Sequence, residues 1–136
     1  MTKPIPPVKN FMTAAPLSIQ KDASLLEAAQ LMQKEHIRHL PVVYQGKIEG
    51  ILTSTDINLI RSLKNVDIEK MKVYDCFTPN PYTVHPDTHL DEVLSEMAEK
   101  KYGCVIISDH DQLVGIFTWV DALIAARDLL ETRLRK

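Results

Sequence analysis

A chain of 136 residues has the length of one ordinary domain, and 45% hydrophobic with 25% charged residues is typical of a globular protein. The formal net charge of −2 argues against non-specific binding to nucleic acid, which requires a basic surface. The first ten residues hold three prolines and no apolar stretch long enough for a signal peptide, and no segment approaches the roughly 20 apolar residues of a membrane span. We therefore expect a cytoplasmic protein with no nucleic-acid or membrane partner.

The first half of the chain predicts a short strand, a helix, a β-hairpin and a second helix. Residues 16–19 are β-prone and lead into a polar turn. Ser24 and Glu27 have the spacing of a capping box, and apolar residues at i, i+3, i+4 and i+7 then predict a helix with one buried face: Leu25, Ala28, Ala29 and Met32. The apolar runs HLPVV and KIEGILT flank a turn at Gln45-Gly46, which is typical of a hairpin. The second helix is expected from about Thr55, and the charged residues 61–71 fit its end and a linker.

The second half repeats this order at an offset of 65 residues. A β-prone segment at 81–84, a helix, the hairpin runs CVIIS and QLVGIFT, and a helix from about Val120 follow one another as in the first half. Between positions 8 and 58 the offset produces 11 identical pairs, including GILTSTD against GIFTWVD. The chain is therefore predicted to be an α/β (α+β) protein made of two β-α-β-β-α repeats.

One repeat of about 50 residues buries too little surface to be comfortably stable alone. We therefore expect the two repeats to pack face to face through their hairpins about a pseudo-two-fold axis, with two equivalent ligand clefts. The predicted organisation is a tail at 1–7, a first repeat at 8–62, a linker at 63–72, a second repeat at 73–127 and the end of the C-terminal helix at 128–136.

The segments IRHLPVV, GKIEGILTSTDI and GIFTWVD resemble the cystathionine-β-synthase (CBS) domain, over about residues 8–125. This resemblance implies a free-standing CBS pair, or Bateman module, which dimerises into a four-repeat disk. It implies a regulatory module rather than an enzyme, with no required cofactor. The ligand would be AMP, ADP, ATP or S-adenosylmethionine, and any magnesium would be bound together with a nucleotide. Ligand binding would change the conformation of the module and thereby its interaction with an unknown regulated protein.

In the CBS family the motif G-h-x-T/S-x-x-D binds a ribose, because an ionised Asp can accept hydrogen bonds from both ribose hydroxyls. A Thr hydroxyl and the free N–H groups at the start of the following helix can contact ribose or phosphate. The resemblance thus implies a first site on Thr53, Thr55 and Asp56, with Arg38 as a phosphate contact and an opposing wall that includes Pro81, Tyr82 and Tyr102. It implies a second site on Thr118 and Asp121, with a wall that includes Pro16, Leu17 and Ile37.

The two sites are expected to be unequal. Gly103 stands at the position of Arg38, and Cys104 stands at the position of His39. The second site therefore lacks a local basic partner, and we expect the site on Asp56 to bind a charged nucleotide more strongly.

A purely structural explanation of the motif remains open. T-x-x-D is also a capping box, so Thr53 with Asp56, and Thr118 with Asp121, would cap the second helix of each repeat. This explanation does not account for Gly50 and Gly115 or for the basic residues before the adjoining strand, which favour ligand binding in at least one site. The alternative function is a ligand-free homodimeric scaffold.

Other side chains carry weaker indications. No metal site is expected, because His36 and His39 straddle a helix end and Asp109–Asp111 fits a solvated turn. Cys76 and Cys104 are interpreted as reduced thiols, and Trp119 as a packing residue rather than part of an adenine pocket. The C-terminal helix is expected over 122–136. Its apolar stripe, which we interpret as a homodimer contact, consists of Leu123, Ala126, Leu130 and Leu134. Its end is basic, which suits the helix dipole, with Arg133, Arg135 and Lys136.

Overall fold

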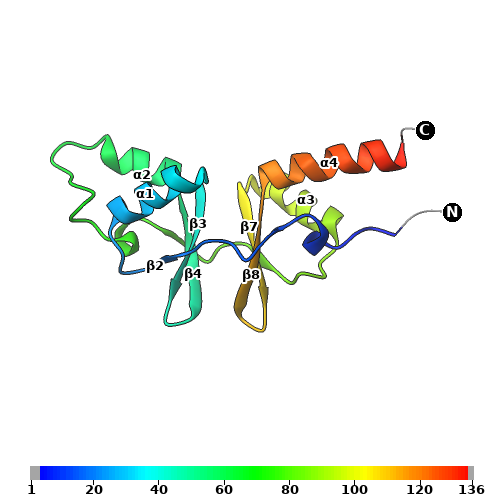
Figure 1. The fold of residues 1–136 in the computed structure, drawn as a ribbon, viewed down its shortest axis with the longest axis horizontal. Coiled ribbons are helices and arrows are strands. Elements are labelled where there is room, and N and C mark those ends of the chain that lie inside the picture. Colours follow the sequence, from blue (N-terminus) through cyan, green and yellow to red (C-terminus); the bar gives the residue numbers. More distant parts are fainter. Residues whose placement is uncertain (1–3, 135–136) are drawn as a thin grey trace. The chain divides into compact units, whose positions relative to one another are not determined.

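The computed structural model describes residues 4–134, which form two compact units. The first unit comprises residues 17–81, and the second unit combines residues 4–16 with residues 82–134. Each unit is a four-stranded sheet with two α-helices (Figure 1). The predicted α/β (α+β) class with two β-α-β-β-α repeats is confirmed.

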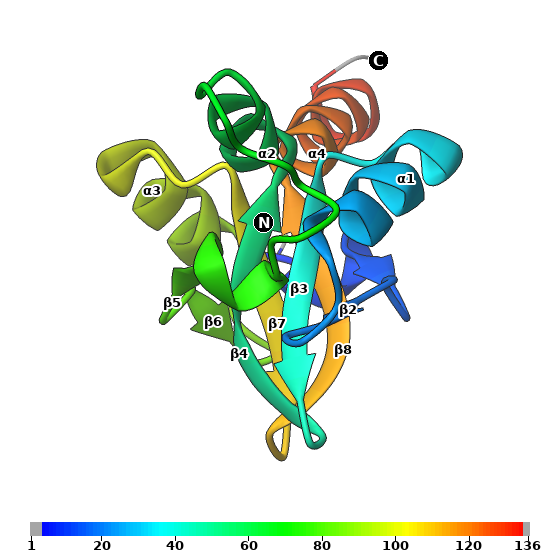
Figure 2. The same ribbon diagram turned by 90° about the vertical axis from the view of Figure 1, so that its left-hand side faces the viewer.

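The first unit has the strand order β2-β3-β4-β5. Strand β2 runs parallel to β3, whereas the β3–β4 hairpin and the β4–β5 pair are antiparallel. In Figure 2 the hairpin turn and helices α1 and α2 lie toward opposite ends of these strands. The elements are β2 (Ile19–Gln20), α1 (Leu25–Glu35), β3 (His39–Tyr44), β4 (Lys47–Thr53), α2 (Ser54–Arg61), the 3-10 helix η2 (Val73–Asp75) and β5 (Thr78–Pro79).

The second unit has the matching strand order β1-β8-β7-β6. Strand β6 runs parallel to β7, and β8 is antiparallel to both β7 and β1. Its elements are the 3-10 helix η1 (Val8–Asn10), β1 (Thr13–Ala14), β6 (Thr83–Val84), α3 (Leu90–Lys100), β7 (Cys104–Asp109), β8 (Gln112–Thr118) and α4 (Trp119–Arg133).

The compact units do not coincide with the sequence repeats, because the segment that begins each repeat belongs to the unit formed by the rest of the other repeat. Strand β1 begins the first sequence repeat but pairs with β8 in the second unit, and β5 begins the second sequence repeat but pairs with β4 in the first unit. Two residues are too few to show the alternation of a strand, so the sequence did not predict β1 and β5. The equally short β2 and β6 were predicted because they lie within or beside the β-prone segments 16–19 and 81–84. The repeat order was predicted correctly, but not this exchange of edge strands.

The helices begin close to where the sequence predicts. Helices α2 and α4 each begin one residue before the expected Thr55 and Val120. At the start of α1 the Ser24 Oγ accepts a hydrogen bond from the Glu27 N–H at 3.1 Å, which is the Ser24 half of the predicted capping box. Helix α4 ends at Arg133, and the predicted basic end at Arg135 and Lys136 lies outside the described residues, as do positions 1–3 of the tail.

Each unit has its own hydrophobic core beneath its helices. In the first unit the predicted face of α1 is buried at Leu25, Ala28 and Met32, and it packs with residues of the sheet and of α2 such as Leu52 and Ile57. In the second unit α3 buries the matching positions against β7 and β8: Leu90, Val93 and Met97 with Val105, Ile107 and Phe117. No helix within residues 4–134 combines the length and the apolar character needed to cross a membrane.

Gly50 and Gly115 allow a neighbouring segment to lie directly against a strand. A Cβ at Gly50 would overlap the backbone oxygen of Thr78 and the ring of Phe77, and one at Gly115 would overlap the side chain of Met12. Both glycines are therefore required by the close approach of the edge strand and the turn before it. This packing explains them without a ligand, so they no longer favour ligand binding as the sequence alone suggested.

We expect Gly50→Ala to be more destabilising than Gly115→Ala. The new methyl at position 50 meets a backbone oxygen, which cannot move without disturbing β5, whereas the Met12 side chain can rotate away. Overpacking of this kind costs about 1–3 kcal/mol, and we place Gly50→Ala at the upper end and Gly115→Ala at the lower end. Urea denaturation measures both, and equal losses of stability would contradict this account of the two glycines.

Candidate functional site

The junction between β4 and α2 holds the first T-x-x-D motif. The Thr53 Oγ1 accepts a hydrogen bond from the Asp56 N–H at 3.1 Å, and the Thr53 N–H donates to the Asp56 Oδ2 at 3.1 Å. The capping box that the sequence offered as an alternative is therefore present. Among the described residues, no hydrogen bond or ion pair reaches the other carboxylate oxygen, Oδ1. Within the described residues, capping consequently engages only one of the two Asp56 carboxylate oxygens.

The junction between β8 and α4 holds the second motif, and its carboxylate has more protein partners. The Asp121 Oδ2 accepts hydrogen bonds from the Thr118 N–H at 2.9 Å and from the Thr118 hydroxyl at 3.3 Å. The Thr13 hydroxyl lies 3.4 Å from Oδ1 and 3.5 Å from Oδ2. Both oxygens of Asp121 therefore already accept hydrogen bonds, in contrast to Asp56.

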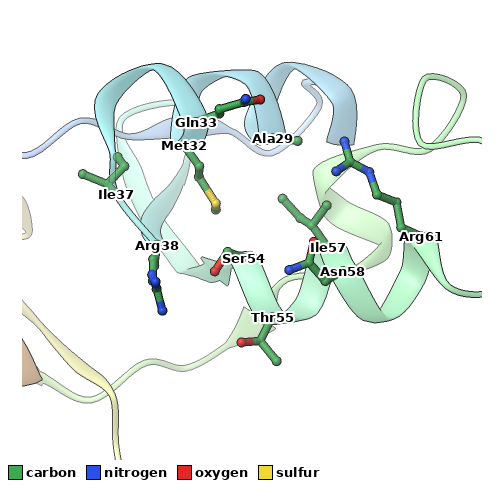
Figure 3. Close-up of a pocket in the computed structure, with 10 residues that line it drawn as sticks. All are labelled: Ala29, Met32, Gln33, Ile37, Arg38, Ser54, Thr55, Ile57, Asn58 and Arg61. Carbon is green, nitrogen blue, oxygen red and sulfur yellow. The ribbon is translucent and has the colours of Figure 1, made fainter.

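A pocket of about 430 Å³ lies between α1 and α2 in the first unit. Three of the predicted site residues line it, namely Ile37, Arg38 and Thr55, whereas Thr53 and Asp56 do not. Figure 3 shows Arg38 at one end and the Arg61 side chain extending from α2 toward α1 at the other. The full lining is Ala29, Met32, Gln33, Ile37, Arg38, Ser54, Thr55, Ile57, Asn58 and Arg61.

Several pocket residues were missed by reasoning from the sequence. Ser54, Asn58 and Arg61 follow one another at i, i+4 and i+7, so they share one face of α2. This spacing was a readable signal, but residues 61–71 were interpreted as the end of a helix and a linker. The pocket therefore continues past the T-x-x-D motif along a face that the motif does not reveal.

The remaining predicted wall residues divide between the two units. Pro81, Leu17 and Ile37 belong to the first unit, and Pro16, Tyr82 and Tyr102 belong to the second. The rings of Tyr82 and Tyr102 are stacked, with centroids 5.4 Å apart. The assignment of these residues to two ligand clefts stays a prediction.

Trp119 exposes 50% of its surface, which is more than the predicted packing role implies.

His39 lies on the strand beside the capped carboxylate. It pairs with Thr53 across the β3–β4 hairpin. Burial, and then the Arg38 guanidinium, hold the pKa of His39 below its ordinary value, and the Asp56 carboxylate opposes this shift. His39 is therefore a neutral imidazole at neutral pH, so Arg38 supplies the positive charge on this side of the pocket.

Cysteines occupy positions close to both motifs. Cys104 stands opposite Thr118 in the β7–β8 hairpin, where His39 stands in the first unit, and burial raises the pKa of its thiol to about 12. The pKa of the Cys76 thiol is also raised, by burial and then by the negative charges of Asp56 and Asp75. Both thiols are protonated at neutral pH, which agrees with their interpretation as reduced, unreactive cysteines.

Two histidines lie against one carboxylate in the second unit. The Asp109 carboxylate contacts His110 Nδ1 at 2.8 Å and His85 Nε2 at 3.4 Å. Within residues 4–134, however, no group of three or more His, Cys, Asp or Glu side chains has an arrangement that could hold a metal ion.

We expect the burial of His39 to make the protein less stable in mild acid. Because its pKa is lower in the folded state than its ordinary value of about 6.5, the unfolded chain takes up the proton first as the pH falls. Stability is then lost below about pH 6.5 until the folded-state pKa is passed. Urea denaturation between pH 7.5 and 5 should show a shallower loss in His39→Gln than in wild type.

The exposed His36 provides the matched control, since its side chain makes no ion pair or hydrogen bond within residues 4–134. His36→Gln lacks the burial that is argued for His39, so the loss of stability in acid should remain as steep as in wild type. If His39→Gln and His36→Gln follow the same curve as wild type, His39 is not held neutral by burial.

Comparison with known proteins assigns the whole fold to one family. The profile of the CBS domain matches residues 8–60 and 73–128. An L-aspartate semialdehyde sulfurtransferase from Methanocaldococcus jannaschii is 33% identical over 89% of this chain, and a CBS domain-containing protein (YhcV) from Bacillus subtilis is 28% identical over 86%. These matches cover 23% of the archaeal relative and 83% of the bacterial one, so the chain spans about a quarter of the length of the sulfurtransferase.

A solved structure shows the same architecture with ligands. This CBS domain pair, in complex with 5′-methylthioadenosine and S-adenosyl-L-methionine, is 31% identical, has a TM-score of 0.82 and is matched over 92% of this chain and 98% of its own. With two sheets of the same strand order, two T-x-x-D junctions and a family profile that matches both repeats, the chain belongs to the CBS domain family.

Proposed function

We propose that this chain is a regulatory module that binds an adenosine-type ligand through the start of α2. The observation that carries the proposal is the free Oδ1 of Asp56 beside a capped Oδ2. A carboxylate oriented in this way can accept hydrogen bonds from ribose hydroxyls without giving up the helix cap. Arg38, which lines the adjacent pocket, would meet a phosphate.

A structure of a related CBS pair supports the proposed class of ligand. The CBS pair that is 31% identical binds 5′-methylthioadenosine and S-adenosyl-L-methionine, which share an adenosine with AMP, ADP and ATP. The adenosine is therefore the part of the ligand that we assign to the site. The phosphate and any magnesium that accompanies it belong to the nucleotide members of this class.

We further propose that the two motifs bind the ligand unequally. The Thr13 hydroxyl and the Thr118 hydroxyl already use acceptor positions of the Asp121 carboxylate, so a ribose would compete with them there. The second unit also has Gly103 where the first has Arg38. Both differences weaken binding at Asp121 relative to Asp56.

Regulation would follow from the place of Asp56 in the fold. The same residue caps α2 and contacts the ligand, so binding would stabilise the start of a helix whose side chains also line a surface pocket. A ligand that prefers one arrangement of this surface shifts the population toward it, and a protein that reads the surface responds. No reaction on the ligand forms part of this proposal.

Thermal unfolding with AMP, ADP, ATP, S-adenosylmethionine and 5′-methylthioadenosine tests the site. A ligand at about a hundred times its dissociation constant should stabilise the protein by ~2.7 kcal/mol, which raises the melting temperature by several degrees. We expect Asp56→Asn to abolish the increase and Asp121→Asn to retain most of it. The Asn side chain keeps an acceptor for the cap, so loss of ligand binding is separated from loss of fold.

The alternative is a ligand-free scaffold, and the same experiment distinguishes it. If no adenosine compound raises the melting temperature of the folded protein, the T-x-x-D motifs serve only as helix caps. If Asp56→Asn and wild type respond equally, the ligand binds elsewhere.

We propose in addition that the module forms a homodimer through α4. One face of this helix packs on its own unit through Ala122, Ala125 and Leu129. The opposite face carries the stripe that the sequence predicted, with Leu123 59% and Leu130 57% exposed. Val120 and Ile124 extend the apolar surface, and a helix that is apolar on both faces is suited to a second buried contact.

We expect Leu123→Glu to convert the dimer into a monomer, because a charge in a desolvated apolar contact has no partner there. Sedimentation velocity over a range of concentrations measures the association state. Tyr74→Glu is the control, since Tyr74 is also half exposed but lies in η2 of the first unit. A wild type that sediments as a monomer at all concentrations would rule out the dimer.

A further inference from the structure

Residues 4–16, called segment 4–16 below, contact several elements of the second unit. The carbonyl of Pro6 accepts a hydrogen bond from the Leu90 N–H at 2.9 Å, at the start of α3, which no side chain within residues 4–134 caps. The carbonyl of Pro4 accepts a hydrogen bond from the Arg133 guanidinium at 3.0 Å, at the end of α4. Because β1 pairs with β8 between these contacts and the rest of the chain, segment 4–16 connects the sheet to both helices of its unit.

Segment 4–16 also contacts the start of α4 through Thr13. Its hydroxyl lies 3.4 Å from the Asp121 Oδ1 and 3.5 Å from Oδ2, so one donor is shared between two acceptors at long distances. A ribose offers two hydroxyls to a carboxylate, one for each oxygen, and can therefore form shorter and more direct hydrogen bonds. Within the described residues, Thr78 at the matching position of β5 makes no bond to Asp56. The Thr13 contact is thus a feature of the second unit that a ribose is able to replace.

The backbone just after β1 is strained. Ala15 has a φ of 49°, a left-handed conformation that its Cβ disfavours, and it precedes Pro16, which favours extended backbone in the residue before it. The matching residue after β5 is Asn80, with a φ of 52°, and asparagine adopts this conformation more readily than alanine. Strand β1 has only two residues, and the Ala15 N–H adds one hydrogen bond to the Val114 carbonyl at 3.1 Å. Few interactions therefore hold β1 against this strain, and the Thr13 contact is one of them.

We propose that Thr13 is an internal competitor for the ribose position at Asp121, and that a ligand bound there releases β1 from β8. The inference rests on the proposed function, because it assigns the regulation of the second site of that function. When a ribose takes the acceptor positions that Thr13 uses, Ala15 relaxes out of its left-handed conformation. Segment 4–16 then loses contacts at both ends of α4, the helix that carries the proposed dimer surface. Part of the binding free energy is spent on this release, so Thr13 lowers the affinity of the second site.

Titration calorimetry with 5′-methylthioadenosine, which has a ribose and no phosphate, tests the competition. Asp56→Asn removes the first site, and it is compared with the double variant Asp56→Asn/Thr13→Val. Since one hydrogen bond to the carboxylate no longer has to be broken, we expect the double variant to bind about fivefold more tightly than Asp56→Asn. Equal or weaker binding in the double variant, or binding by neither protein, would overturn the proposal.

Thr78→Val is the matched control for this experiment, since Thr78 has the same position in β5 but makes no bond to Asp56 within residues 4–134. It is measured in an Asp121→Asn background, in which only the first site remains, and it should leave the affinity unchanged. A gain in affinity equal to that of Thr13→Val would mean that the lost hydroxyl acts without the Asp121 contact, and the proposal would fail.

Hydrogen exchange of the wild-type chain tests the release of β1. With 5′-methylthioadenosine at a concentration that saturates both sites, the amides of residues 13–15 should exchange faster than without ligand, whereas those of residues 78–80 should not. Ala15→Gly relieves the strain and holds β1 in place, so in the Asp56→Asn background it should weaken binding about threefold. Unchanged or slower exchange at residues 13–15, or unchanged affinity in Ala15→Gly, would contradict the release.

The same titrations separate this inference from the proposed function. If wild type binds 5′-methylthioadenosine, Asp56→Asn does not, and Thr13→Val restores no binding to Asp56→Asn, the proposed function stands and the inference fails. If wild type does not bind but Thr13→Val alone does, the internal competitor is supported and the proposed role of Asp56 is rejected.

Discussion

The reciprocal hydrogen bonds between Thr53 and Asp56 fix the part of the first unit on which its candidate site depends. Strand β4 ends at Thr53 and α2 begins at Ser54, so no loop separates sheet from helix. The orphan N–H groups of the first helical turn must be satisfied at this point, and the capping box does so with residues that already belong to the junction. The orientation of the Asp56 carboxylate follows from this arrangement, whereas the face that α2 turns to the core is set by the burial of Ile57.

A cap and a ligand contact are compatible because a carboxylate has two oxygens. At Asp56 the cap engages one of them, whereas at Asp121 the Thr13 hydroxyl contacts Oδ1 and the Thr118 hydroxyl contacts Oδ2. The sequence presented capping and binding as competing explanations of one motif. The contact to the Oδ1 of Asp121 comes from a threonine of the edge strand, and the equivalent Thr78 in β5 makes no such bond to Asp56 within the described residues.

The sequence predicted the features that periodicity and repetition encode. Both hairpins, all four helices and the α1 core face at Leu25, Ala28 and Met32 follow from apolar spacing and the 65-residue offset. It did not predict β1 and β5, which have two residues each, pair with a strand of the other sequence repeat and lie in no β-prone segment that was recognised. The sequence analysis interpreted Gly50 and Gly115 as part of a ligand motif. The structure shows that a larger side chain at these positions would overlap Phe77 and Thr78, or Met12.

The candidate site was predicted only where a motif marks it. Asp56 and Arg38 are recognisable from GILTSTD and IRHLPVV, but Arg61 enters the pocket through the helical spacing of α2 and through α1 opposite it, a tertiary contact that no local pattern records. The neutral state of His39 likewise depends on burial and on Arg38, neither of which its position in the sequence reveals.

The exchange of edge strands makes the two repeats interdependent as folding units. A chain divided within residues 62–72 would give a first half whose β4 has no β5 beside it, and a second half whose β8 has no β1. Each fragment would expose the unpaired backbone of a strand at the point where its glycine leaves no side chain to cover the gap, and such an edge is a template for aggregation. The duplicated sequence is thus not two independent copies, because each sheet is completed only by residues from the other half of the polypeptide.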